Sequence, residues 1–187
     1  KKDGRTIMKA YGAWVGTIVF VLFVCLVIVL FWVMIWDTNR FVIKRYVFQS
    51  DKLKKNCRIV FLSDLHNKEY GAGNKLLLQA IEEAAPDLVI AGGDMLTAKP
   101  GVSFQKAVSF LLKCGEKYPV YYAIGNHEYR IRIYPENYGR MYQEYMESFA
   151  QSSIRFLDNE SYLLPEYGIR LTGLTIDREY YKRFVKR

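Results

Sequence analysis

The stretch RIVFLSDLHN, residues 58–67, decides how this chain folds. It begins with a short run of β-branched and aromatic residues, which is typical of a strand that enters a protein core. The run ends at an acid, Asp64, and an imidazole, His66, and both groups are costly to bury without a partner. We therefore expect the end of this strand to present a site where both side chains meet a ligand.

The same pattern occurs twice more along the chain. The segments DLVIAGGD (87–94) and VYYAIGNH (120–127) also run from apolar strand formers, through small residues, to polar side chains of ligand type. Thirty residues separate Asp64 from Asp94 and thirty-two separate Asp94 from Asn126, which fits strand–helix–strand units. Continuous apolar strands of this kind predict an α/β fold whose parallel sheet is covered on both faces.

Helical patterns lie between and after these strands. Residues 74–85 begin with a favourable N-cap residue, Asn74, and stop before Pro86. Residues 103–114 have an apolar helical face, with Ser103 as the expected N-cap and Gly115 as the expected left-handed C-terminal residue. We predict a third helix over residues 137–151.

The predicted third helix carries an aromatic and methionine stripe on one side. Two interpretations are open: the stripe packs onto the sheet, which is the favoured one, or it lines a lipid-binding groove. Short strands are expected at 154–157, 161–164 and 169–175, and a further strand at 41–49.

Residues 11–36 contain no charged side chain and are mostly apolar. About 20 apolar residues suffice to cross a bilayer as a helix, and tryptophans lie near both ends of this run. A cleaved signal peptide is disfavoured, since the run is long and no small-residue cleavage site follows it. We expect an uncleaved, single-pass anchor in the cell membrane.

The excess positive charge is confined to the region of this anchor. Residues 1–58 hold eleven basic and three acidic side chains, whereas the remainder holds sixteen of each. Basic flanks suit anionic lipid headgroups, and a neutral domain gives no support to nucleic-acid binding. Because both flanks are basic, the charges do not fix the orientation, and our expectation is an exported domain.

Parallel strands place their carboxyl ends at one edge of a sheet, where open α/β folds bind ligands. That edge would gather Asp64, His66, Asp94, Asn126 and His127. Carboxylate, imidazole and amide oxygen together suit manganese, iron or zinc. Side chains two apart in an extended strand point the same way, so Asp64 and His66 are expected to bind one ion.

The fragments SDLH, GGD and GNHE resemble the first three motifs of the calcineurin-like metallophosphoesterases. The match is closest to their bacterial membrane-anchored branch and covers residues 41–177. The resemblance implies the N-terminal part of a β-sandwich flanked by helices (αββα), preceded by one transmembrane helix. It divides the chain into a basic flank (1–10), an anchor (11–36), a juxtamembrane segment (37–57) and a phosphoesterase domain (58–187) that is incomplete at its C-terminus.

The resemblance also implies a role for each residue of the site. Asp64 and His66 would hold the first of two divalent ions (Mn, Fe or Zn), Asp94 would bridge both ions, and Asn126 would hold the second. His127 would contact the phosphate and protonate the leaving oxygen, with Glu128 as an acid behind the ligands. The implied reaction is two-metal hydrolysis of a phosphodiester, pyrophosphate or phosphomonoester. A membrane tether makes a lipid-linked or nucleotide-sugar substrate plausible, and no nucleic-acid partner is expected.

The family pattern also includes downstream histidines, and this chain has no histidine after His127. The sequence is therefore interpreted as a fragment or a truncated gene product that, on its own, holds metal weakly and hydrolyses little substrate. The alternative is a catalytically impaired pseudoenzyme that acts as a membrane-tethered interaction module.

Overall fold

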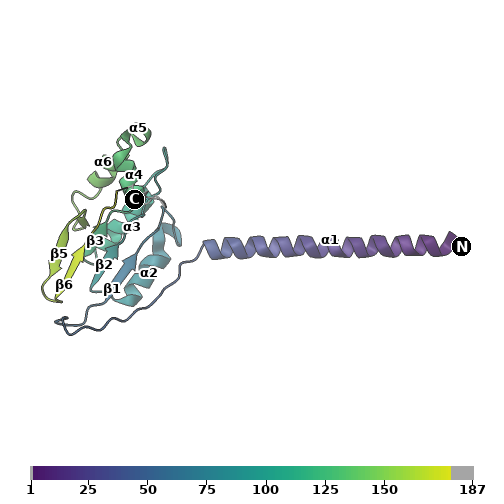
Figure 1. The fold of residues 1–187 in the computed structure, drawn as a ribbon, viewed down its shortest axis with the longest axis horizontal. Coiled ribbons are helices and arrows are strands. Elements are labelled where there is room, and N and C mark those ends of the chain that lie inside the picture. The colour runs from purple at the N-terminus through teal and green to yellow at the C-terminus, as the bar shows by residue number, and fades with distance from the viewer. Residues whose placement is uncertain (1, 178–187) are drawn as a thin grey trace, which may run out of the picture. The chain divides into compact units, whose positions relative to one another are not determined.

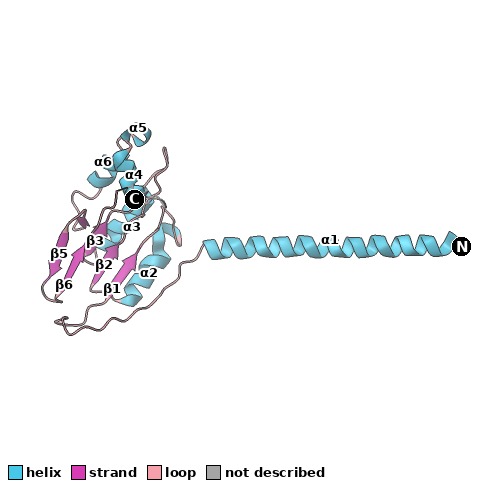
Figure 2. Ribbon diagram, in the orientation of Figure 1, coloured by secondary structure: helices cyan, strands magenta, loops and turns pink. Residues whose placement is uncertain are grey.

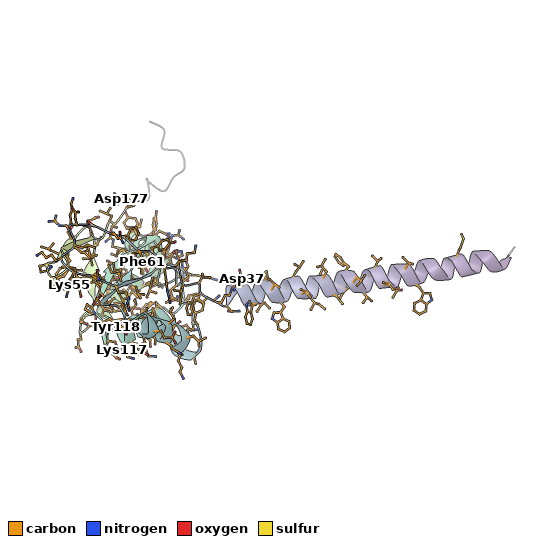
Figure 3. All side chains as sticks on the ribbon, turned by 90° about the horizontal axis from the view of Figure 1, so that it is seen from below. Asp37, Lys55, Phe61, Lys117, Tyr118 and Asp177 are labelled. Carbon is orange, nitrogen blue, oxygen red and sulfur yellow. The ribbon has the colours of Figure 1, made fainter. Side chains whose placement is uncertain are left out.

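The computed structural model describes residues 2–177 and divides the chain after Lys44 into two units. The C-terminal end of the predicted domain, residues 178–187, lies outside the described residues. The first unit contains the helix α1 (Lys2–Thr38). Within it, Trp14–Thr38 contains an 18-residue window with a mean hydropathy of 3.4 and has no buried residue, and its side chains project outward from a single helix (Figure 3). This segment is long and apolar enough to cross a membrane, a property that signal sequences share.

The second unit contains a parallel sheet whose order, β1-β2-β3-β4, follows the chain (Figure 1). One row of paired residues, Phe61, Ile90, Tyr121 and Arg155, crosses all four strands. The predicted α/β fold with a parallel sheet is thereby confirmed. The strands are β1 (Ile59–Leu62), β2 (Leu88–Ala91), β3 (Val120–Ala123) and β4 (Arg155–Leu157).

Helical segments connect the parallel strands (Figure 2). Each of the longer connecting helices buries an apolar face, as Leu77 and Ile81 do in α2. Such burial accounts for most helix stability in a folded domain. The connections contain η1 (Ala72–Asn74), α2 (Lys75–Ala84), α3 (Gln105–Gly115), α4 (Asn126–Ile133), α5 (Pro135–Tyr138) and α6 (Met141–Glu147).

Consecutive residues of β3 show which elements cover the two faces of the sheet, because side chains alternate along a strand. Tyr122 is fully buried and its ring contacts the rings of Tyr145, in α6, and Phe149. Tyr121 faces the opposite way, into an apolar cluster with Leu164 of the last hairpin. One face of the sheet is thus covered by helices and the other, in part, by strands.

The last hairpin consists of β5 (Ser161–Leu164) and β6 (Ile169–Thr172), which pair antiparallel. It contributes Leu164 and the turn residue Tyr167 to the apolar cluster on the second face. Toward β1, the edge strand among the described residues, this face is covered less: Phe61, labelled in Figure 3, is 64% exposed. The two-stranded element therefore covers only part of the sheet.

Two predicted elements differ from the structure. The expected strand at 41–49 is an extended segment without ladder partners among the described residues, and Val47 and Phe48 are each more than 80% exposed. Strand formers need a neighbouring strand to pair with, and here none is present. The expected helix over 137–151 is interrupted at Gly139, whose φ of 58° lies in the left-handed region.

The predicted helix ends were also partly wrong. Asn74 does not cap α2 with its side chain; it is itself left-handed, and its Oδ1 accepts a hydrogen bond from the Tyr70 amide instead. Gly115 is the last residue of α3, and the residue after it remains right-handed. Ser103 does accept a hydrogen bond from the Gln105 amide near the start of α3.

Candidate metal centre

Three loops meet at the carboxyl ends of β1, β2 and β3. The loop after β1 runs beside the loop after β2 as a continuation of the sheet: the Asp64 amide donates to the Gly93 carbonyl at 3.2 Å, and the His66 amide donates to the Asp94 carbonyl at 3.0 Å. The sheet thus extends its hydrogen bonding into the segments that carry the predicted ligands.

The sequence analysis predicted extended backbone at Asp64 and His66, and this prediction was wrong. Their φ angles are 58° and 50°, so both residues adopt left-handed conformations. Their side chains still lie close together, with 3.7 Å between His66 Nε2 and Asp64 Oδ1. Both side chains are exposed to solvent, and the Asp64 carboxylate also accepts a hydrogen bond from Ser63 Oγ at 2.6 Å.

Asp94 lies at the centre of the site and is only 8% exposed. Its Oδ2 accepts a hydrogen bond from Asn126 Nδ2 at 2.9 Å, and its Oδ1 accepts one from the His127 amide at 2.8 Å. A carboxylate has about four acceptor sites. Each oxygen of Asp94 therefore retains a lone pair for a further ligand, as a bridging carboxylate requires.

The side chains of His66, Asp94 and His127 form a compact cluster, with potential ligand atoms within 4.8 Å of one another. The two imidazole rings meet edge to face, with their centres 4.6 Å apart. Asn126 joins this cluster through its hydrogen bond to Asp94. The structure therefore brings together the residues selected from three separate motifs, and Asp64 flanks them through its contact with His66.

The orientation of His127 separates it chemically from the other members of the cluster. Its Nδ1 accepts a hydrogen bond from the Ala98 amide at 2.8 Å, so the neutral ring carries its proton on Nε2. Burial lowers the pKa of His127, which favours this neutral form. A protonated Nε2 is a hydrogen-bond donor and is poorly suited to hold a metal ion.

The close approach of the second and third loops depends on two glycines. A Cβ atom at Gly93 would lie 2.4 Å from the Cα of Gly125, and a Cβ at Gly125 would lie 2.3 Å from the Asp94 amide nitrogen. Gly93 also has a φ of 93°, which side chains rarely adopt. Glycine at both positions lets the loops touch.

The donor set at this edge fits a divalent cation. His66 and Asp94 offer an imidazole nitrogen and a carboxylate with free lone pairs, and Asn126, whose Nδ2 is bound to Asp94, has an amide oxygen beside them; these groups are ligands for Mn, Fe and Zn. The side-chain amide of Asn67, next to His66, is buried with neither polar atom hydrogen-bonded. An ion or an ordered water at this edge of the sheet would satisfy these two atoms.

Sequence reasoning missed the groups that support this cluster. Glu128 was selected only as the last residue of the GNHE motif. Tyr122, whose hydroxyl donates to the Glu128 carboxylate, and Tyr145, whose hydroxyl pairs with that of Tyr122, were not selected at all. The hydrogen bond that orients His127 comes from the backbone amide of Ala98, so the residue type at position 98 does not reveal it. For Tyr145 the one available signal was its place in the aromatic stripe, whose packing against the sheet is confirmed by the burial of Tyr145 and Phe149.

Comparison with known proteins places this site in a family. A family model described as "Calcineurin-like phosphoesterase" matches residues 57–185. A protein of Campylobacter jejuni named "Uncharacterized metallophosphoesterase Cj0846" is 32% identical over 89 residues. That alignment covers 46% of this chain and 24% of the relative, so the chain spans about a quarter of the relative's length.

The match to the family model contains all three loops of the site and more than half of the chain. The metallophosphoesterases are hydrolytic and normally bind divalent metals, in agreement with the donor set described above. This protein therefore belongs to the calcineurin-like phosphoesterase family.

Proposed function

We propose that this protein is a metal-dependent phosphoesterase that acts on a phosphodiester, a pyrophosphate or a phosphomonoester at a membrane surface. The observation that carries the proposal is the cluster of His66, Asp94 and His127 at the carboxyl edge of a parallel sheet. A carboxylate with free lone pairs beside two imidazoles, one of them a fixed hydrogen-bond donor, suits phosphoester hydrolysis better than simple ion storage.

Each residue has a distinct task in this proposal. Asp64 and His66 would hold one divalent ion, Asn126 would hold a second, and Asp94 would be shared between them. When bound, such ions neutralise the phosphoryl oxygens and lower the pKa of an attacking water. His127 would present its Nε2–H to the phosphate as a hydrogen-bond donor, because the Ala98 amide occupies its Nδ1 and the ring is neutral. The leaving oxygen would take up the proton that the attacking water releases.

The proposed location rests on α1, whose segment Trp14–Thr38 is apolar and unburied. An uncleaved span would tether the site to the bilayer, which makes lipid-linked or nucleotide-sugar phosphoesters natural candidates. In the same proposal the β5–β6 hairpin belongs to the second layer of a β-sandwich, since it packs on the sheet face opposite the helices. Turnover of monoester, diester and pyrophosphate substrates, compared with added Mn²⁺, tests the substrate class.

Replacement of Asp94 tests the proposed chemistry. We expect the full chain in detergent micelles to bind Mn²⁺, measured by electron paramagnetic resonance, and to hydrolyse bis-p-nitrophenyl phosphate. Asp94→Ala should abolish both, because it removes the carboxylate at the centre of the cluster. Asp51→Ala removes an exposed carboxylate and should change neither. Hydrolysis that persists in excess chelator, or in Asp94→Ala, would refute the proposal.

A second candidate function is a membrane-tethered interaction module with impaired catalysis. It is favoured by the small number of imidazole ligands in these 187 residues. There are two histidines, and the Nδ1 of one of them, His127, already accepts a hydrogen bond from the Ala98 amide. On this reading the chain binds metal weakly and turns over little substrate. Two tightly bound metal ions per chain, together with rapid turnover that Asp94→Ala abolishes, would exclude it.

A further inference from the structure

The carboxylate of Glu128 is the most enclosed charged group at the site, at 1% exposure. Hydrogen-bond donors surround it. Oε2 accepts from the amides of Asp94 (2.8 Å) and Gly125 (3.1 Å), while Oε1 accepts from the amide of Met95 (2.8 Å), from that of Leu96 (3.4 Å) and from the Tyr122 hydroxyl (2.7 Å). Every partner donates, so the group fits its place as an acceptor-only carboxylate.

A second hydroxyl extends this arrangement into the core. The Tyr145 and Tyr122 hydroxyl oxygens are 2.7 Å apart. Because Tyr122 gives its proton to Glu128, its oxygen accepts from Tyr145, and the donor direction along the chain is fixed. Both tyrosines are fully buried, one in β3 and the other in α6. The carboxylate is therefore held in place by two packed aromatic residues of the core.

Glu128 joins the two loops that carry Asp94 and Asn126. A single oxygen, Oε2, accepts from the loop after β2 and from the loop after β3. Asp94 has a φ of 55°, a conformation that an L-residue adopts only when its surroundings hold it there. The amides of Asp94 and Met95 both donate to Glu128, so the carboxylate holds the peptide groups that precede and follow the Asp94 Cα.

We propose that Glu128 is the positioning residue of the metal centre: its carboxylate, oriented by the Tyr122–Tyr145 hydroxyl pair, fixes the loop of Asp94 against the loop of Asn126. This inference deepens the proposed function and rests on it for the identity of the ligands. Glu128 acts through the backbone and does not touch the substrate.

Amide hydrogen exchange in the metal-free full chain tests the proposal directly. Glu128→Gln keeps the size of the side chain but replaces one acceptor oxygen with a donor group, which faces donors on every side. We expect exchange in peptides covering residues 92–98 to accelerate by about tenfold or more, since buried amides lose their acceptor. Peptides from α2 should exchange as in the unsubstituted chain.

A metal titration gives a second measurement. Outer groups that orient ligands typically contribute about 10–100-fold to metal affinity. We expect Glu128→Gln to weaken Mn²⁺ binding within that range. Glu82→Gln, which removes a surface carboxylate paired with Lys117, is the matched control and should change neither affinity nor exchange.

Tyr122→Phe keeps the proposal testable if Glu128→Gln fails to fold, because it removes a single hydroxyl from a ring that stays packed. It should also accelerate exchange at 92–98, by a smaller factor. Unchanged exchange there in a folded variant, or an equal increase throughout the domain, would overturn the inference. Since the exchange measurement requires no metal, its outcome is distinguishable from a failure of Asp94→Ala to abolish metal binding.

Discussion

Three of the proposed ligand residues adopt a backbone conformation that side chains ordinarily avoid. Asp64, His66 and Asp94 have φ angles between 50° and 58°. Left-handed backbone costs about 1–2 kcal/mol for a residue with a Cβ atom, and aspartate tolerates it better than most. Strain of this kind gathers at functional sites, where the surrounding structure holds it in place. These left-handed residues change the direction of the chain as it leaves β1 and β2, which brings the proposed ligands close together.

The glycines beside these ligands provide a residue-scale prediction. Gly93→Ala and Gly101→Ala both place a Cβ on left-handed backbone, but only the former meets another chain segment. We expect Gly101→Ala to cost about 1 kcal/mol in unfolding free energy. Gly93→Ala should cost about 1–3 kcal/mol more, because its loop must move away from Gly125. Urea denaturation measures both, and equal costs would contradict the close approach of the loops.

The buried thiol of Cys114 predicts a dependence of stability on pH. Burial raises its pKa from 9.0 to about 12, so the folded state keeps the proton at a pH where the unfolded chain loses it. The contribution of this thiol to stability is unchanged well below pH 9 and decreases as the pH rises through 9 toward 12. Between pH 8 and pH 10 this thiol should account for a loss of about 1.4 kcal/mol. Urea midpoints at both values should decline less for Cys114→Ala, and identical declines would exclude this role.

The sequence could predict which residues lie together at this edge of the sheet but not the backbone conformation that brings them there. Asp64, His66, Asp94, Asn126 and His127 were identifiable because each follows an apolar strand. Their left-handed turns were not, since no local pattern distinguishes them from extended chain. The role of Tyr145 was hidden for another reason: its hydroxyl meets Tyr122 only through packing of α6 on the sheet.

At the scale of elements, the parallel strands were predictable and the segments around them less so. Each strand has a run of apolar strand formers and a partner at crossover distance, so pattern and pairing agree. The segment 41–49 has the same composition but no partner among the described residues, and composition alone does not make a strand. Over 137–151 the apolar periodicity continued through Gly139, which hid the break between α5 and α6.

The hairpin at the second face of the sheet permits a prediction with an internal control. Leu164 and Leu163 are neighbours in β5, but Leu164 is 4% exposed within the apolar cluster and Leu163 is 52% exposed. Leu164→Ala should lower the unfolding free energy by about 2–5 kcal/mol. Leu163→Ala should change it by no more than about 0.5 kcal/mol. Chemical denaturation checks both, and similar costs would mean that the hairpin does not pack as described.

At the scale of the whole molecule, the first question is what α1 does. We expect the full chain expressed in bacteria to stay in the membrane fraction after alkaline carbonate extraction, with its mass unchanged. Arginine at both Leu22 and Ile28 should release it, since each charge at the centre of a span costs about 2.5–3.5 kcal/mol on insertion. Arginine at Met8, outside Trp14–Thr38, is the matched control and should leave it bound. A shortened, extractable product would identify a cleaved signal sequence instead.

The order of the parallel sheet has a consequence for how the domain assembles during synthesis. Because β1, β2, β3 and β4 are neighbours in the order in which they are made, each new strand finds its partner already available. Each pairing still spans a crossover of about thirty residues, as between Ile59 and Leu88, so it forms more slowly than a hairpin. The ligand loops would then come together in sequence, with Asp94 joining His66 first. The Asn126 loop would arrive with β3, and Tyr145 would lock the arrangement only when α6 had emerged.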